Sequence, residues 1–155
     1  MHIGAQGPYK DVVVVCSSGQ PAAPAAFWGI IAAGGVFSAA SHSFTPEELA
    51  RQIIQGNSNL LVVSKDMVGL GREAAGLAGL ALDRVVVLES DPRWEFKTLE
   101  GGKKADTVDG PRLTWRRLTD LQELKRSLIV LLYSSGTTGV PKGRQSRSQA
   151  DGAHS

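Results

Sequence analysis

Short hydrophobic runs alternate along this chain with longer segments of helical character. Residues 12–16, 60–63 and 85–88 are almost entirely aliphatic, and residues 36–37 begin a shorter apolar run. A continuous apolar run of four or five residues is typical of a strand that is buried on both faces, as in a parallel sheet. The pattern therefore predicts several central strands in one sheet.

The segments between these runs predict helices. Residues 21–33 are apolar nearly all round, which favours a buried helix. Thr45 is followed by proline and, three residues later, by Glu48, a pattern typical of a helix N-terminus closed by a capping box. A further helix is expected from Ser64 to about Leu80. Strand and helix in alternation indicate βαβ units, and therefore an α/β fold with a mostly parallel sheet and flanking helices.

Charged residues become frequent in the second half of the chain, and the pattern weakens there. We expect a long exposed loop over residues 89–126, with a short ordered piece near 113–118 and a helical turn near 121–124. Residues 128–133 are again aliphatic and predict a strand that returns the chain to the sheet.

The composition is that of a globular domain, with 42% hydrophobic and 21% charged residues among 155. A net charge of +2 gives no argument for nucleic acid. The lone Cys16 has no partner for an internal disulfide, which favours a reducing, cytoplasmic setting. No secretory signal is apparent, and the ending Ala153-His-Ser155 does not match a peroxisomal signal. Residues 21–40 carry no charge, but their alanine, glycine and proline content favours a buried helix and strand over a membrane span.

The most informative stretch follows the last aliphatic run and spells Ser134-Ser-Gly-Thr-Thr-Gly-Val-Pro-Lys-Gly143. Glycines let several backbone N–H groups face one point, and hydroxyls and an ammonium add donors, so the stretch suits a polyphosphate. A Walker loop is excluded, because its second glycine would fall on Pro141. No dinucleotide fingerprint follows any expected strand. The three histidines lie far apart without cysteine pairs, so we expect no metal site built from them.

This stretch resembles the signature of the adenylate-forming superfamily, which includes acyl-CoA synthetases, coumarate-CoA ligases, luciferases and nonribosomal-peptide adenylation domains. Every position of the signature matches, and the resemblance covers about residues 11–143, since the segments 11–15, 26–36 and 45–49 are similar in order and spacing. It implies a partial N-terminal subdomain of that fold, an AMP-binding domain over 11–143 that ends at the phosphate loop. Residues 1–10 are expected to be frayed or disordered, and 144–155 to form a disordered tail.

The resemblance also implies the chemistry. The expected activity is that of an ATP-dependent acid–CoA ligase, in which a carboxylate attacks ATP to give an acyl-adenylate and coenzyme A then gives the thioester. ATP, Mg²⁺ and coenzyme A are implied as cofactors or co-substrates, and a small carboxylic acid as substrate. The residues expected to line the phosphates are Ser134, Ser135, Gly136, Thr137, Thr138, Gly139 and Lys142.

Members of the superfamily are several times longer and carry adenine, ribose and lid motifs that do not occur here. The sequence therefore predicts a truncated ligase fragment that is inactive alone, with no catalytic residue assigned. The alternative is a non-catalytic interaction or nucleotide-binding module derived from the family, which would associate with a full-length paralogue through an open sheet edge.

Overall fold

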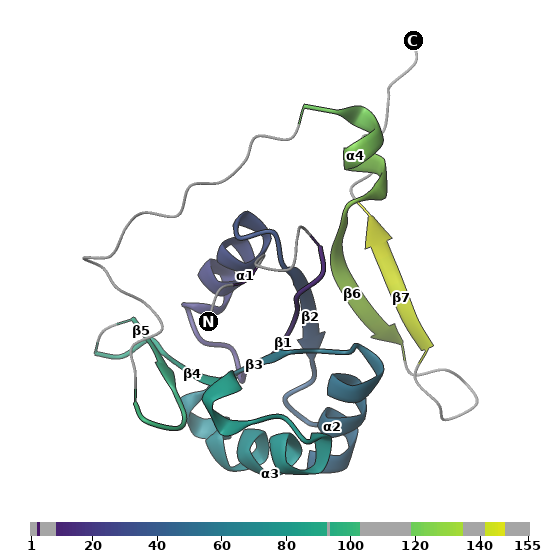
Figure 1. Ribbon diagram of the computed structural model, residues 1–155. Helices are drawn as coiled ribbons and strands as arrows, with labels where there is room; N and C mark the ends of the chain where they lie inside the picture. The colour runs from purple at the N-terminus through teal and green to yellow at the C-terminus, as the bar shows by residue number, and fades with distance from the viewer. Residues whose placement is uncertain (1–2, 4–8, 93, 103–118, 135–141, 148–155) are drawn as a thin grey trace.

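The computed structural model describes residues 3, 9–92, 94–102, 119–134 and 142–147, with only the backbone for residues 134 and 142–147. These residues form a seven-stranded sheet in the order β5-β4-β3-β1-β2-β6-β7 (Figure 1). The strands are β1 (Val12–Cys16), β2 (Val36–Ala40), β3 (Leu60–Ser64), β4 (Val85–Glu89), β5 (Glu95–Thr98), β6 (Leu128–Ser134) and β7 (Lys142–Arg147). The helices are α1 (Ala23–Ala32), α2 (Pro46–Gln55), α3 (Val68–Ala78) and α4 (Leu121–Arg126), with 3₁₀ turns η1 (Lys65–Met67) and η2 (Leu82–Arg84).

The five inner strands are parallel, as the apolar runs predict. β1 lies at the centre between β2 and β3, β4 extends the sheet beyond β3, and β6 extends it beyond β2. The two outer strands, β5 and β7, are antiparallel to their neighbours. The α/β class and the mostly parallel sheet are therefore confirmed.

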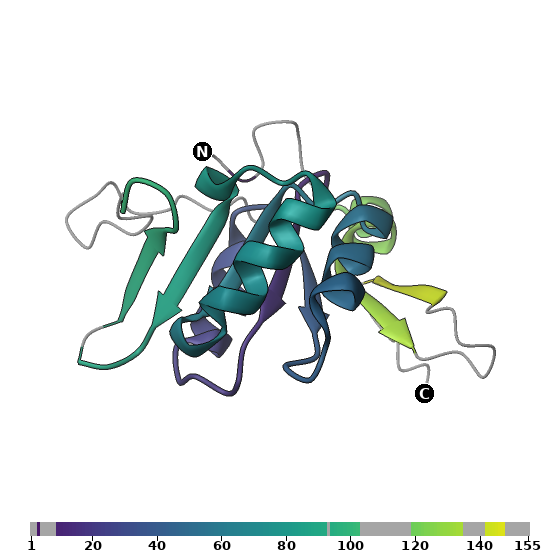
Figure 2. The ribbon, with the colours of Figure 1, turned by 90° about the horizontal axis from the view of Figure 1, so that it is seen from below.

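Helices cover the two faces of the sheet unequally. Alternate side chains of β1 point to opposite faces, so that Val13 and Val15 pack with Ile30 of α1, whereas Val14 packs with Leu49 of α2 and Ala74 of α3. Figure 2 shows α2 and α3 side by side on one face, with α1 behind the sheet on the other.

The expected capping box of α2 is confirmed. The Thr45 hydroxyl accepts a hydrogen bond from the Glu48 amide at 3.3 Å, and the Glu48 carboxylate accepts one from the Thr45 amide at 2.9 Å. The next helix begins later than expected, because η1 separates Ser64 from α3. Ser64 makes no capping hydrogen bond, and its hydroxyl bonds instead to the loop after β1.

Two short strands differ from the sequence expectation. β5 lies within the segment predicted as a long loop, and β7 covers residues 144–147, where a disordered tail was predicted; both predictions are wrong at these positions. Polar sequences such as Glu-Phe-Lys-Thr suit the edge of a sheet, where charged side chains limit pairing with another chain. The helical turn near 121–124 is confirmed as α4, whereas the ordered piece near 113–118 and residues 148–155 lie outside the described residues.

No helix within the described ranges is both long enough and apolar enough to cross a membrane.

Candidate functional site

The predicted phosphate loop joins β6 to β7, and its two ends are held side by side. β6 ends at Ser134 and β7 begins at Lys142, and these two residues are Cα partners in the antiparallel ladder; Tyr133 is likewise opposite Gly143. The intervening residues 135–141 lie outside the described residues. Of the seven predicted site residues, the structure therefore brings together the backbones of Ser134 and Lys142 at the neck of a hairpin. The other five, Ser135, Gly136, Thr137, Thr138 and Gly139, stay predictions.

The position of this hairpin in the sheet is suited to a ligand. β6 is parallel to β2, with Phe37 opposite Val130 and Ser38 opposite Leu131, so Ser134 lies at the edge where the other parallel strands also end. Figure 1 shows the arrowheads of β2 and β6 directed to the same side. Ligands of open α/β sheets bind outside the carboxyl ends of the strands, because the loops that follow them converge there.

Polar side chains from the loops after β1 and β3 meet at the same carboxyl edge. The Ser64 hydroxyl accepts a hydrogen bond from the Ser18 amide at 3.3 Å. Hydrogen bonds from the side chains of Ser18 and Ser64 hold the pKa of the neighbouring Asp66 below its usual value. We call Ser18, Ser64 and Asp66 the edge cluster; it keeps a carboxylate ionised beside the ends of β1 and β3.

The loop after β4 is tied to this edge by further polar contacts. The side-chain carbonyl of Gln20 accepts a hydrogen bond from the Ser90 amide at 3.1 Å, and the Ser90 hydroxyl accepts one from the Ala22 amide at 3.1 Å. Lys65 forms an ion pair with Glu89. The loops after β1, β3 and β4 therefore support one another across the edge.

Sequence reasoning identified the hairpin loop but not these supporting contacts. The sequence pattern assigns no role to residues 17–20 and marks Ser64 only as the start of a helix. The signal that was available is topological: polar residues that directly follow the apolar runs of a parallel sheet share one edge. The pairing of particular residues across that edge depends on the strand order, which the apolar runs do not encode.

The cysteine near this edge is not a candidate nucleophile. Cys16 is fully buried, and its sulfur lies 3.5 Å from the Ser41 carbonyl oxygen and 3.8 Å from the Met67 sulfur. Burial, with a smaller contribution from the charge of Asp66, raises the pKa of the thiol to about 11. The thiolate is the reactive form of cysteine, and a raised pKa keeps the Cys16 thiol protonated near neutral pH. Cys16 is therefore a residue of the hydrophobic core.

Tyr133, near the end of the strand that precedes the hairpin loop, packs with the buried cluster of Val12, Val36 and Leu131. Tyr133 borders a small hollow of about 30 Å³ beside Gln52, and burial raises the pKa of its phenol. The Gln52 amide donates hydrogen bonds to the Ser38 hydroxyl and to the Ala39 carbonyl, each at 2.9 Å. α2 is thus tied to β2, the parallel neighbour of β6, and Tyr133 of β6 borders the same hollow as Gln52.

The part of the chain that the structure describes contains no group of three or more His, Cys, Asp or Glu side chains arranged to hold a metal ion. The Mg²⁺ that the family resemblance implies would be bound together with ATP phosphates, and the described residues do not test that expectation.

Comparisons with known proteins match most of the chain. The model of a family described as AMP-binding enzyme matches residues 4–148. A protein of Emericella nidulans named as an acyl-coenzyme A synthetase is 41% identical over 141 residues, which are 91% of this chain and 26% of that protein. The 4-coumarate:CoA ligase 1 of Petunia hybrida is 29% identical over 136 residues, 86% of this chain and 22% of the ligase. The chain thus spans about a quarter of the length of these relatives.

Solved structures show the same fold. A long-chain-fatty-acid-CoA ligase from Archaeoglobus fulgidus superposes with a TM-score of 0.68 at 16% identity, over 91% of this chain and 26% of that one. ATP-bound MatB from Rhodopseudomonas palustris superposes with a TM-score of 0.60 at 22% identity, over 90% of this chain and 25% of that one. At such identities the likeness establishes the fold of the subdomain.

Proposed function

This chain belongs to the AMP-binding enzyme family, and from that premise we propose that it provides the ATP-phosphate loop of an acid–CoA ligase. The observation that carries the proposal is the hairpin neck, where Ser134 and Lys142 pair at the carboxyl edge of the sheet. A pinned neck limits the conformations of the short loop between them, which lowers the entropy cost of gathering several donors around one phosphate group.

Each proposed residue has a physical role in that loop. The hydroxyls of Ser134, Ser135, Thr137 and Thr138 and the backbone amides at Gly136 and Gly139 would donate to the β- and γ-phosphates of ATP. Lys142 would add a positive charge beside the pyrophosphate as it departs. The contribution of the loop is thus positioning and charge stabilisation.

The proposed reaction has two steps. In the first, a carboxylate oxygen attacks the α-phosphorus of ATP, the bond to the bridging oxygen breaks, and pyrophosphate leaves with its electron pair. In the second, the thiolate of coenzyme A attacks the acyl carbon and AMP leaves, giving the thioester. The donors of the loop act in the first step, because the charge on the leaving pyrophosphate increases there.

We further propose that these 155 residues do not complete the reaction by themselves, since they span only about a quarter of the matched ligases. Purified chain with ATP, Mg²⁺ and a panel of aromatic and fatty acids should release no pyrophosphate. Release above that of a Lys142→Ala control would contradict the inactivity. Saturable binding to a full-length relative would instead favour an interaction module, which stays a prediction.

The position at which phosphates bind can be tested by titrating pyrophosphate into the ¹⁵N-labelled chain and following the amide chemical shifts. The backbone amides of residues 134–140, 142 and 143 should show the largest chemical-shift changes, because they would donate to the phosphate oxygens. If the largest changes fell on α1 or β5 instead, the hairpin loop would not be the phosphate site.

A further inference from the structure

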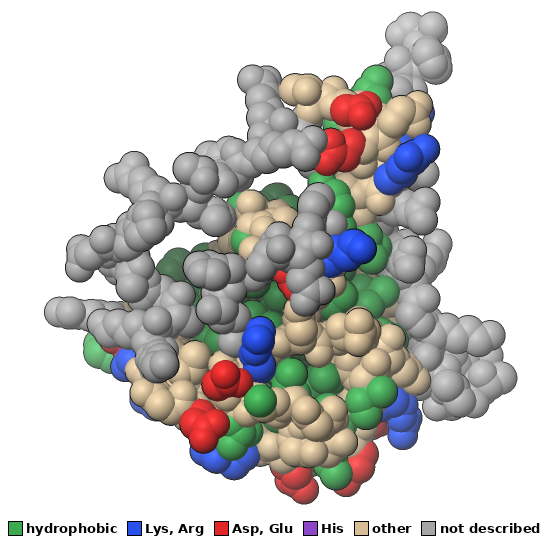
Figure 3. Space-filling view, in the orientation of Figure 1, with side chains coloured by type: hydrophobic (Ala, Val, Ile, Leu, Met, Phe, Trp, Pro, Cys, Tyr) green, Lys and Arg blue, Asp and Glu red, His purple; other side chains and the backbone are tan. Residues whose placement is uncertain are grey.

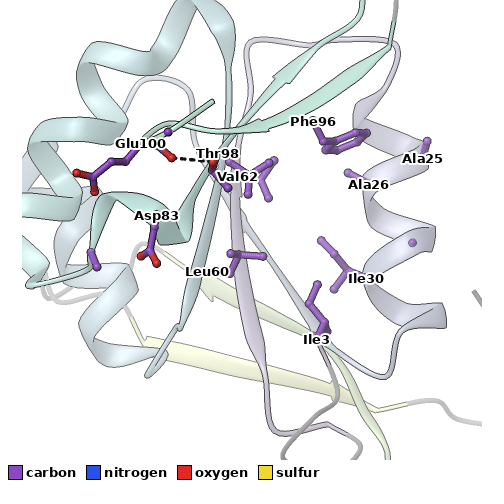
Figure 4. Close-up of a pocket in the computed structure, with 14 residues that line it drawn as sticks. Ile3, Ala25, Ala26, Ile30, Leu60, Val62, Asp83, Phe96, Thr98 and Glu100 are labelled. Carbon is purple, nitrogen blue, oxygen red and sulfur yellow. Dashed lines mark hydrogen bonds between the residues drawn. The ribbon is translucent and has the colours of Figure 1, made fainter. Parts of the chain in front are cut away.

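A hollow of about 940 Å³ lies between α1 and β5, on the sheet face that α1 covers. Leu60 and Val62 of β3 and Val86 of β4 form its floor, and Ile30 of α1 and Phe96 of β5 form its walls. Figure 4 shows the side chains of Leu60 and Val62 on one side of this space and those of Ile30 and Phe96 on the other. Figure 3 shows hydrophobic side chains set back from the viewer beside α1.

The hollow is a recess and not a flat apolar face. Its floor residues Leu60, Val62 and Val86 are only 6%, 4% and 4% exposed. A deep, mostly apolar space of several hundred Å³ that carries a few polar groups is the usual form of a small-molecule site. Its floor is formed at Leu60 and Val62, the first and third residues of β3, and at Val86, the second residue of β4, whereas the phosphate loop follows the carboxyl end of β6.

The polar groups of the hollow are gathered at one end and carry one sign of charge. Asp83 and Glu100 lie there, on the side away from α1 (Figure 4). The Thr98 hydroxyl beside them donates to the Glu100 carbonyl at 2.8 Å. Of the described residues that line the hollow, two are acidic and none is basic. A ligand that fills this space therefore meets apolar surface along its length and, at the end away from α1, the exposed acidic residues Asp83 and Glu100.

We propose that this hollow binds an amphipathic molecule with an apolar body and a cationic end group, such as a primary alkylamine. The apolar body would cover the floor of β3 and β4, and the ammonium would lie near Asp83 and Glu100. A ligand with a carboxylate end group would instead be repelled by the negative charges of Asp83 and Glu100. The chemistry of the hollow thus differs from that of the acid substrates in the proposed function, and the site does not depend on that function.

The test uses three probes of equal chain length, octylamine, octanol and octanoate, titrated into the full chain and followed by isothermal calorimetry and ¹⁵N chemical shifts at neutral pH. Octylamine, which is protonated there, should bind about tenfold more tightly than octanol, because two partly solvated carboxylates contribute roughly this much. Octanoate should bind most weakly. The shifts should be largest for the residues of β3, β4 and α1 that line the hollow.

Variants locate the site and separate its charge from its shape. The double change Asp83→Asn with Glu100→Gln should reduce octylamine affinity to that of octanol. Gly29→Leu should block all three probes, because Gly29 lines the hollow and an added side chain meets no atom within 4 Å. Gly76→Leu is the matched control, since Gly76 also has open space but lies on α3, on the opposite face. Far-ultraviolet circular dichroism checks that each variant folds.

Three outcomes overturn the proposal. Octylamine binding no tighter than octanol removes the role of the carboxylates. Binding that survives Gly29→Leu, or that is lost equally in Gly76→Leu, places the ligand elsewhere. Absence of saturable binding by any probe removes the site altogether.

Discussion

The packing of α3 on β3 can be tested with one pair of matched substitutions. Gly71 and Gly76 lie on the same helix, but only Gly71 touches the sheet. A methyl group added at Gly71 would lie 2.8 Å from Cγ1 and 3.2 Å from Cγ2 of Val63, whereas one at Gly76 would meet no atom within 4 Å. Val63 is fully buried and β-branched, so it cannot rotate away at low cost.

The expected free energies follow from two opposing effects. Alanine is favoured over glycine inside a helix by about 0.8–1.0 kcal/mol, which acts at both positions. Overpacking a close-packed contact costs about 1–3 kcal/mol and acts only at Gly71. Gly76→Ala should therefore stabilise the fold by up to about 1 kcal/mol, and Gly71→Ala should leave it unchanged or destabilise it by up to about 2 kcal/mol.

The measurement is urea denaturation followed by far-ultraviolet circular dichroism, with the difference between the two variants as the decisive quantity. That difference should be about 1–3 kcal/mol, because the helix-propensity gain cancels. If the two variants changed the free energy of unfolding in the same direction and by the same amount, α3 would not pack on Val63 as described.

Three further predictions concern single side chains. Thr45→Ala should lower the free energy of unfolding by about 1 kcal/mol, measured by denaturation, because α2 loses its capping box; an unchanged value would contradict that box. Cys16 should react with iodoacetamide at about pH 8 more than a hundredfold more slowly in the folded than in the unfolded chain, since its pKa is raised to about 11. The contribution of the buried, protonated Cys16 thiol to the free energy of unfolding is complete below the ordinary thiol pKa. This contribution is lost as the pH rises toward 11. Ser18→Ala should raise the pKa of Asp66 in an NMR titration, because the hydroxyl donates to that carboxylate; an unmoved pKa would remove Ser18 from the edge cluster.

The sequence predicts the centre of this fold better than its edges. The apolar runs at β1, β3 and β4 are long enough to indicate buried parallel strands, and the Thr45–Glu48 pattern places the start of α2, because capping is a local interaction. β5 and β7 carry no such signal. Their sequences are polar, and they are strands only because the backbones of β4 and β6 offer hydrogen-bonding partners.

The candidate site also has one part that the sequence predicts and one part that it does not. The composition of the loop and its place after β6 are visible in the sequence, because glycines, hydroxyls and a lysine follow an aliphatic run. The pairing of Ser134 with Lys142 is not visible, since it requires β7. The edge cluster was missed because Ser18 and Ser64 are 46 residues apart and meet only through the pairing of β1 with β3.

ATP binding to matched lysine variants tests the proposed phosphate loop most directly. Titration of ATP with Mg²⁺ into the chain, followed by ³¹P chemical shifts, should give weak, saturable binding with a Kd on the order of millimolar. Lys142→Ala should weaken it about tenfold, because a charged hydrogen bond to phosphate is lost. Lys125→Ala, an exposed change on α4, should leave it unaltered. Equal binding by the two variants, or no phosphate shift at all, would contradict the assignment of the loop.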